Sequence, residues 1–421
     1  MVSNDRAAAA ACKLIYIMTG SLWLIILLPK EIQFVLFFAL PAAYMIMYRR
    51  FVRISRITAP FLAYAAFHLI SVAAAVLRGG CDTLRILAAL NTCGIWVAGV
   101  LAAGIKTGEK SPDKDRIGRY CAVNIFILFF VFLLTYPFPG AVINNFFEIR
   151  SAWTGDILLT GETVRFSGFF EYPALVSFFT LLQFPWAFAH LAGKDRSWLS
   201  FLLIPAAGIP VLMTYSRTGT ALNILMFAAC IVCFALSNGI SAGKVTLTAL
   251  SAAAAVLVIA GLCGRDAGVI IDKLINLRPG SNSDRMSIYR ESIGRIRETS
   301  LLIGAGVKDM NRAGVYPLGS HSTYLGFVYK SGILGTLCAL SGIIITFLSV
   351  IRADVKDRML RALIIVMYVL LGIFCLTEDI DGADWLLVTV MVFTKAYLDG
   401  ACGRPQEPKS QTVVMSEEDT A

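Results

Sequence analysis

The sequence predicts an all-α polytopic membrane protein, with about 12 transmembrane helices and a large helical extracytoplasmic loop between helices 9 and 10. Composition is the first observation behind this. Of 421 residues, 57% are hydrophobic and 15% are charged, whereas soluble domains carry about 25% charged residues. The mean hydropathy is +0.72. The second observation is that apolar runs close to 20 residues, the length that crosses a bilayer, recur along the chain.

The apolar runs define a single transmembrane domain, residues 1–403, followed by a polar tail, 404–421, which we expect to be disordered in the cytoplasm. The first run lacks a small-residue cleavage site before the next run begins, so we expect it to be retained. The predicted spans are 12–29, 31–48, 57–77, 84–105, 120–138, 172–192, 199–214, 218–237, 244–263, 322–350, 360–377 and 384–399.

Positive charges favour an orientation with both termini in the cytoplasm, because short inward-facing loops are enriched in Lys and Arg. Four or more basic residues fall in each of the predicted inward loops around 49–56, 106–119 and 352–361. The short outward loops hold only Lys30, Arg78, Arg85 and Arg217. Two long loops, 139–171 and 264–322, are then extracytoplasmic.

The ten cysteines lie mostly within apolar spans. Cys230 and Cys233 form a CxxC pair, but inside a span and without nearby histidines. Free cysteines behave as small apolar core residues. We therefore predict neither a disulfide framework nor a metal site, and no cofactor is expected.

The loop 264–322 is rich in basic residues although it faces outward. Long loops are translocated regardless of charge, so the orientation stands. One interpretation is a solvated helix face with local ion pairs, such as Glu291 with Arg295. The other is a site for an anionic ligand, because arginine matches phosphate geometry. The basic residues are Arg265, Lys273, Arg278, Arg285, Arg290, Arg295, Arg297, Lys308 and Arg312.

Residues 284–300 of this loop are predicted to form a helix. Met286, Tyr289, Ile293 and Ile296 recur at steps of three and four and so form one apolar face. We expect Asn282, Ser283 or Asp284 to cap its start. Arg285, Arg290 and Arg297 would therefore lie on a folded element.

His321 is the most informative of the three histidines. His68 and His190 lie in or at the end of apolar spans and are expected to be packed or interfacial. His321 instead borders water beside many cations, which favour its neutral form, the form that a general base needs. Its residue type and position make it a candidate catalytic base.

Two further features lie at span ends, and a third lies inside a span. Arg165 belongs to RFSGFFEYP, and Arg217 follows Ser216 in SRTG, after two prolines, Pro205 and Pro210, that are expected to interrupt the preceding helix. Either arginine could be a snorkelling anchor or could reach into a cavity. Lys330 lies inside a span, where lysines usually face a cavity or a partner; the acidic residues at 378–384 could supply that partner.

Four motifs in order, RxSGxFxxP, SRTG, RxxxY followed by GxG, and H-S/N-x-Y-L with GxLG, resemble those of the O-antigen ligase and polymerase superfamily. These are membrane glycosyltransferases of surface polysaccharide assembly that act on polyprenyl-pyrophosphate-linked saccharides. The resemblance covers roughly residues 160–350. Two departures are Ser322, where asparagine is frequent, and Ala174 after Pro173.

The resemblance implies roles for particular residues. Arg217, Arg285 and Arg165 would bind the donor's pyrophosphate in place of a metal, and His321 would take the proton from the acceptor hydroxyl, giving inversion. Possible supporting residues are Ser216, Ser322, Tyr324, Arg290 and Lys330.

The predicted function is therefore transfer of a saccharide from undecaprenyl pyrophosphate to an acceptor hydroxyl, most simply by an O-antigen or exopolysaccharide repeat-unit polymerase. Ligase-type transfer to a lipid, protein or wall acceptor is the alternative. A lipid-linked saccharide transporter or flippase, or a non-enzymatic scaffold, is less favoured, because polar residues gather on one side of the membrane. The expected partners are the lipid-linked donor, the acceptor, the bilayer and a chain-length regulator, without nucleic acid. The expected location is the inner membrane of a bacterium.

Overall fold

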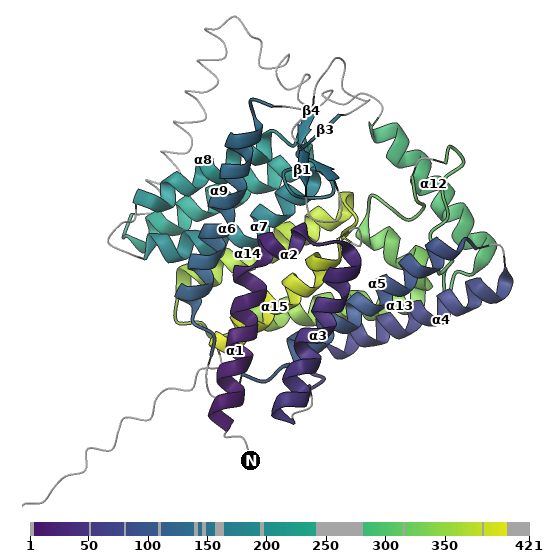
Figure 1. The fold of residues 1–421 in the computed structure, drawn as a ribbon, viewed down its shortest axis with the longest axis horizontal. Coiled ribbons are helices and arrows are strands. Elements are labelled where there is room, and N and C mark those ends of the chain that lie inside the picture. Colours follow the sequence, from purple (N-terminus) through teal and green to yellow (C-terminus); the bar gives the residue numbers. More distant parts are fainter. Residues whose placement is uncertain are drawn as a thin grey trace, which may run out of the picture.

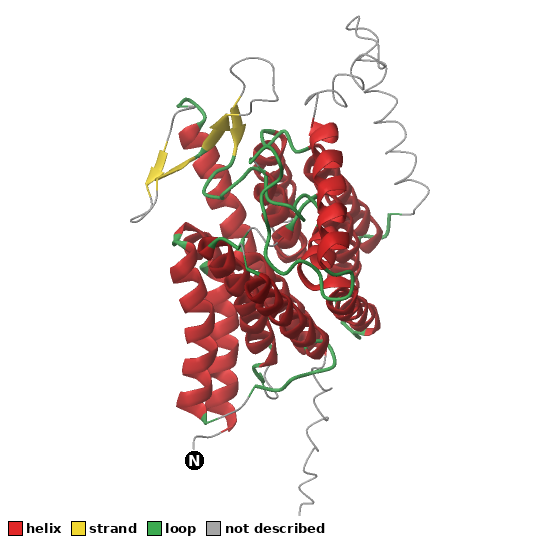
Figure 2. Ribbon diagram, turned by 90° about the vertical axis from the view of Figure 1, so that its right-hand side faces the viewer, coloured by secondary structure: helices red, strands yellow, loops and turns green. Residues whose placement is uncertain are grey.

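The computed structural model describes residues 4–49, 52–79, 81–107, 111–138, 142–144, 149–155, 164–193, 198–240, 281–314, 316–380 and 383–401. Within these ranges the protein is mostly helical (Figures 1 and 2), and eight helices are long and apolar enough to cross a membrane. These eight are α3 (Lys30–Tyr48), α4 (Ala59–Arg78), α5 (Thr83–Gly104), α6 (Lys114–Thr135), α7 (Ala174–Ala192), α9 (Arg217–Ser237), α13 (Thr323–Arg352) and α14 (Arg358–Thr377).

The remaining helices are α1 (Asn4–Gly20), α2 (Leu22–Leu27), α8 (Trp198–Leu212), α12 (Ser281–Thr299) and α15 (Asp384–Ala401). Eleven of the twelve predicted spans thus coincide with helices, the first being divided between α1 and α2. The predicted span 244–263 and the start of the loop 264–322 lie outside the described residues. The count of twelve therefore stays a prediction.

α8 corrects one expectation, because it continues through Pro205 and Pro210. Membrane helices tolerate internal prolines when neighbouring groups satisfy the freed carbonyls. The prolines therefore do not end the helix, which stops instead at Leu212, shortly before Ser216 caps α9.

α7 lies at the centre of one half of the bundle and packs against α6, α8, α9 and α14. In its most apolar 18-residue window, 94% of the residues are buried inside the protein. A helix that is apolar on every side needs such surroundings. The ring of Phe184 lies 4.5 Å from that of Phe227, and Phe178 lies 5.5 Å from Phe374.

The second half of the bundle contains α4, α5 and α13, which lie side by side (Figure 1). α13 is broken at Gly332, which has φ +62°. The backbone groups freed there are satisfied by the preceding loop: Ala305 N–H donates to the Tyr329 carbonyl at 2.7 Å, and Ile333 N–H donates to the Leu301 carbonyl at 3.0 Å. A Cβ at Gly332 would lie 2.2 Å from the Leu302 oxygen.

The loop 139–171 contains strands that an all-α prediction omits. β1 (Val142–Asn144) pairs with β2 (Ile149–Ser151), and β3 (Trp153–Gly155) pairs with β4 (Val164–Phe166), both antiparallel. The register places Thr154 opposite Arg165. Figure 2 shows these strands at the end of the molecule opposite the N-terminus.

α12 confirms the predicted loop helix but only part of its expected buried face, since Ile296 is buried and Tyr289 is half-buried. The residues that pack inward are Ile288, Ser292 and Ile296, whereas Met286 and Ile293 are exposed. The small Ser292 allows a close turn, since its Oγ accepts a hydrogen bond from Gly319 N–H at 2.8 Å. Because α12 begins at Ser281, the three expected capping residues lie in its first turn.

Candidate functional site

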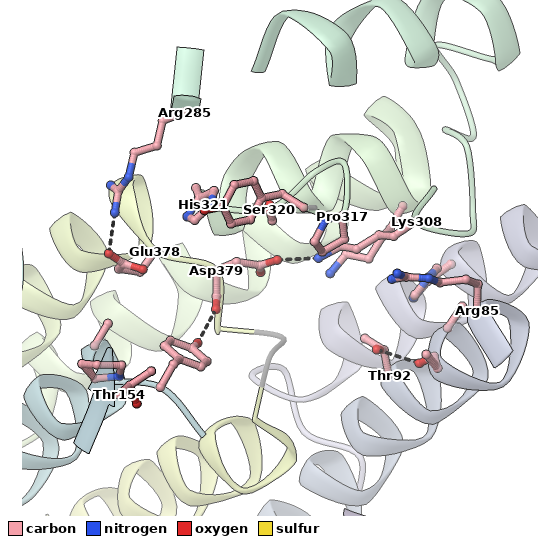
Figure 3. A pocket seen from close by; sticks show the side chains of 18 of the residues that line it. Arg85, Thr92, Thr154, Arg285, Lys308, Pro317, Ser320, His321, Glu378 and Asp379 are labelled. Atoms are coloured by element: carbon pink, nitrogen blue, oxygen red, sulfur yellow. Dashed lines mark hydrogen bonds and ion pairs between the residues drawn. The ribbon is translucent and has the colours of Figure 1, made fainter. Parts of the chain in front are cut away.

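A cavity of about 740 Å³ opens between the loops and the helix ends on the side of α12 (Figure 3). This volume is typical of small-molecule sites. Its walls come from six separate parts of the chain: α4, α5, the β3–β4 region, α12, the 306–321 loop with α13, and the segment after α14. The charged and titratable side chains that line it are His68, Arg85, Arg165, Tyr172, Arg285, Lys308, Tyr316, His321, Lys330, Glu378 and Asp379.

Arg165 is aimed into the cavity by the second hairpin. It lies on β4, and its Nε donates to the Thr214 carbonyl at 2.7 Å. The turn that follows is fixed by Gly168, with φ +59°, and by the hydrogen bond between the hydroxyls of Thr154 and Ser167. The RxSG motif therefore links this arginine to the end of α8.

Arg217 begins α9, close in sequence to the carbonyl that Arg165 contacts, but it does not line the cavity. Ser216 caps the helix, with its Oγ accepting from Gly219 N–H at 3.3 Å. The SRTG motif thus forms the capped N-terminus of α9. The predicted contact of Arg217 with a pyrophosphate stays a prediction.

Arg285 enters the cavity from the first turns of α12. Its guanidinium donates to Glu378 Oε1 and to the Thr377 carbonyl, both at 2.8 Å. The two charged side chains are 22% and 12% exposed, so this pair is largely shielded from solvent. Figure 3 shows the pair at one side of the cavity, with His321 beside it.

His321 lines the cavity in a backbone conformation that is unusual for a non-glycine residue, with φ +61°. Such strain costs on the order of 1–3 kcal/mol and persists only when the surroundings impose it. Here Tyr289 of α12 donates its hydroxyl to the His321 carbonyl at 2.8 Å, and the Tyr316 ring packs edge-on at 5.6 Å. Burial raises the pKa of Tyr289, so its hydroxyl keeps the proton for this bond.

Lys330 and Lys308 bring two lysine amino groups to the same cavity. Lys330 is 2% exposed, lies two residues before the break in α13, and has its Nζ 5.7 Å from the Phe327 ring centroid. Lys308 forms an ion pair with Asp379. The predicted acidic cluster therefore supplies partners in the cavity, where Glu378 pairs with Arg285 and Asp379 pairs with Lys308.

The acidic segment after α14, Glu378 and Asp379, is contacted by several of the segments that form the site. Thr323 at the start of α13 holds it, because its Oγ1 donates to the Glu378 carbonyl at 2.8 Å and accepts from Ile380 N–H at 3.1 Å. Tyr172 donates to the Asp379 carbonyl at 3.1 Å. The α12 helix, the RFSGFFEYP segment and the start of α13 thus meet at two acidic residues, Glu378 and Asp379. Asp381 and the side chain of Asp384 lie outside the described residues.

The other residues proposed to support the site, Ser322, Tyr324 and Arg290, do not line this cavity. Ser322 caps α13 through a 3.4 Å hydrogen bond from Leu325 N–H, and Arg290 is exposed on α12. Tyr324 donates to the Gly372 carbonyl at 3.0 Å and lines a second cavity, about 950 Å³ and mostly apolar, which Phe327 also borders. Lys330 and Phe327 therefore lie at different cavities on one helix.

The solvated-face interpretation of the loop is correct for part of it. The expected pair between Glu291 and Arg295 does not form; instead Arg295 Nε binds Asp309 at 2.9 Å, and Glu291 accepts from Arg312 N–H at 2.9 Å. Arg297 is exposed. Arg265, Lys273 and Arg278 lie outside the described residues. Among the described members of this basic set, Arg285 and Lys308 alone line the cavity.

Sequence reasoning missed Arg85 and His68 as cavity residues. Arg85 appeared only as a charge in a short loop, and His68 as a packed histidine within a span. No local pattern marks either residue, because their place in the cavity follows from how α4 and α5 pack against the 303–310 segment. In the part of the chain that the structure describes, no group of three or more His, Cys, Asp or Glu side chains could hold a metal ion.

The comparison with known families agrees with these motifs. Residues 199–340 match the family described as O-antigen ligase. The matched segment runs from the start of α8 to beyond the break in α13, and it includes α12, Lys308 and His321. No curated protein matches the chain. Over residues 199–340 the chain is similar to the O-antigen ligase family, and eight of its described helices are long and apolar enough to cross a membrane.

Proposed function

We propose that the protein is a glycosyltransferase of the bacterial cytoplasmic membrane, with both termini in the cytoplasm. It moves a saccharide from undecaprenyl pyrophosphate to an acceptor hydroxyl on the extracytoplasmic side, as a repeat-unit polymerase of surface polysaccharide. One observation carries the proposal: the cavity gathers Arg165, Arg285 and His321, from three separate segments, at one end of an apolar helical bundle.

The cations suit a pyrophosphate leaving group. As the anomeric bond breaks, negative charge builds on the pyrophosphate, and preorganised donors stabilise it. Arginine is suited to this because its planar fork binds phosphate oxygens in pairs. Arg85 adds positive charge to the same cavity, which Lys308 and Lys330 also line. We infer that the donor reaches Arg285 by competing with Glu378, and that Arg217 approaches from the start of α9.

His321 is suited to act as the base. Its backbone is held by Tyr289, and its ring is packed by Tyr316, so the imidazole has a fixed place beside the cations. In the proposed step an acceptor hydroxyl attacks the anomeric carbon, its proton passes to His321, and the carbon–oxygen bond to pyrophosphate breaks. The displacement inverts the anomeric centre and needs no metal.

Ligase-type transfer is the second candidate, because the matching family is described as O-antigen ligase. The two activities share donor and chemistry and differ in the acceptor. A transporter for the same lipid is less favoured. The broken helix α13 is a feature that transporters use, but here the 301–305 loop closes the break.

The test is transfer by the purified full chain in lipid nanodiscs, supplied with an undecaprenyl-pyrophosphate oligosaccharide and EDTA. A polymerase gives a ladder of longer chains on the same carrier. A ligase gives product only when a lipid, protein or wall acceptor is added. Absence of transfer under all of these conditions, with carrier movement across the bilayer instead, would contradict the proposal and favour a transporter.

A further inference from the structure

A second histidine lies in the wall of the cavity. His68 of α4 is fully buried at 0% exposure and lines the same space as His321. Its Nε2 lies 3.1 Å from the Gly306 carbonyl oxygen. The sequence places His68 in the middle of a span, where a packed ring would be the ordinary interpretation. Its hydrogen bonding argues for a more specific role.

The contact with Gly306 fixes which nitrogen carries the proton. A carbonyl oxygen can only accept a hydrogen bond, so Nε2 must be the donor. In the neutral ring, Nδ1 then presents a lone pair. Nδ1 is buried and has no hydrogen-bond partner in the described part of the chain. A buried acceptor left in this state costs free energy unless a ligand or water satisfies it.

The bond to Gly306 is not the sole attachment between α4 and this loop. Ser71 Oγ donates to the Ile303 carbonyl, and Arg78 donates to the Ala305 carbonyl at 3.2 Å. A Cβ on Gly306 would lie 2.3 Å from the Ser71 carbonyl oxygen, so the two backbones are in close contact. The loop is therefore already held, and the ring is positioned rather than required for attachment.

A second polar atom at the same cavity is also buried without a hydrogen-bond partner among the described residues. Ser320 Oγ is buried, has no hydrogen-bond partner among the described residues, and belongs to a residue that lines the cavity. Figure 3 shows Ser320 next to His321. A hydroxyl can donate and accept, whereas Nδ1 of His68 can only accept. Together they suit a ligand that carries several hydroxyl groups.

We propose that Nδ1 of His68 accepts a hydrogen bond from a sugar hydroxyl, and that this wall of the cavity is a saccharide-binding subsite. The ligand class follows from the chemistry. A phosphate oxygen without a proton is an acceptor and cannot pair with a lone-pair nitrogen, whereas a sugar hydroxyl can donate to it. The inference rests on the proposed function, and the sugar could belong to the donor or to the acceptor.

Two substitutions separate the two ring nitrogens. In His68→Gln the side-chain amide can reach Gly306 as Nε2 does, but no acceptor remains at the Nδ1 position. In His68→Asn the amide oxygen takes the Nδ1 position and the bond to Gly306 is lost. We expect His68→Gln to raise KM for one of the two saccharide substrates roughly tenfold, and His68→Asn to leave KM within about threefold of wild type while lowering Tm.

Ser71→Ala is the matched control, because it removes a neighbouring bond to the loop from a residue outside the cavity lining. It should lower Tm without changing either KM. A rise in the donor KM assigns the subsite to the donor sugar, and a rise in the acceptor KM assigns it to the acceptor. Unchanged KM values in His68→Gln, or equal rises in both His68 variants, would overturn the inference.

Binding of the free saccharide, measured as the shift in Tm of the full chain, distinguishes this inference from the proposed function. If wild-type protein binds the saccharide but transfers nothing, the proposed function fails. Weaker binding by His68→Gln would then still support the subsite, while equal binding by wild type and His68→Gln would refute it.

Discussion

The two ends of α14 carry ion pairs of the same kind in different surroundings. At its start, Lys114 binds Asp357 at 2.6 Å, with side chains 51% and 24% exposed. At its end, Arg285 binds Glu378 at 2.8 Å, with side chains 22% and 12% exposed. The first pair is an exposed contact between α6 and α14. The second lies in the cavity and joins α12 to a segment that α13 also holds.

This difference indicates that the cavity end of α14 contains features that lower the stability of the fold. Shielded ion pairs cost desolvation and are weak evidence of stabilisation, and a histidine with positive φ adds strain. Both occur at the cavity end, together with the break in α13. The exposed end has an ordinary capped helix start, in which Leu360 N–H donates to Asp357 Oδ1 at 3.0 Å.

Replacement of His321 should have the largest effect. A general base contributes about 10²- to 10⁴-fold to a rate, so His321→Ala should lower kcat by that factor with wild-type donor binding. The check is single-turnover transfer with saturating donor. His190→Ala is the control, since His190 contacts Asp115 near the start of α6, away from the cavity. Full activity in His321→Ala would refute the catalytic role.

Arg285→Ala should lower kcat/KM by about 10²-fold, because one donor to developing charge is lost. Part of the loss would come from Glu378, which keeps its charge without its partner. Arg285→Lys separates the two effects, because an ammonium can still pair with Glu378 but cannot bind phosphate in the paired way. Arg290→Ala, an exposed arginine of the same helix, should transfer normally. Equal kinetics in Arg285→Ala and Arg290→Ala would contradict the donor-binding role.

Much of the cavity end was predictable from the sequence. Arg165, Arg285 and His321 were identified by motif and by family resemblance, and they meet at one cavity. The loop helix was predictable because its apolar residues follow a helical period. The buried face of this helix was not predictable, since Met286 and Ile293 fit the helical period as well as Ile288 does. The contact of Ser292 with Gly319 selects the face that is buried.

The contacts that complete the site could not be predicted, because they join segments far apart in the chain. Nothing local distinguishes Glu378, which pairs with Arg285, from its acidic neighbours; the position of Thr323 decides the pairing. Gly332 lies within one continuous apolar run that reads as an unbroken span. The break appears only when the 301–305 loop offers its carbonyls and N–H groups to α13.

Gly332→Ala should destabilise the protein by on the order of 1–3 kcal/mol, because alanine is strained at φ +62°, and its Cβ would meet the Leu302 oxygen. Lys330 would then be displaced, so donor KM should rise as Tm falls. Thermal unfolding followed by transfer assays would measure both. Gly400→Ala, at a glycine with open space around it, is the control. Normal Tm in Gly332→Ala would mean that the break is not held by the loop.

The smallest effect is expected at the exposed end of α14. Partial burial opposes ionisation of Asp357, but hydrogen bonds from Leu360 N–H, Lys114 and Met359 N–H, with the charge of Lys114, outweigh it and hold the pKa of Asp357 below its usual value of 3.8. A lowered pKa contributes stability above the usual pKa, and this contribution is lost as pH falls through the folded value. Asp357→Asn keeps a capping oxygen and removes the charge, so it should cost less than about 1 kcal/mol at neutral pH. Unfolding curves of variant and wild type should converge as pH falls below 3.8, and Asp357→Asn should leave transfer unchanged. A loss of transfer comparable to that of Arg285→Ala would mean that the two ends of α14 do not differ in function.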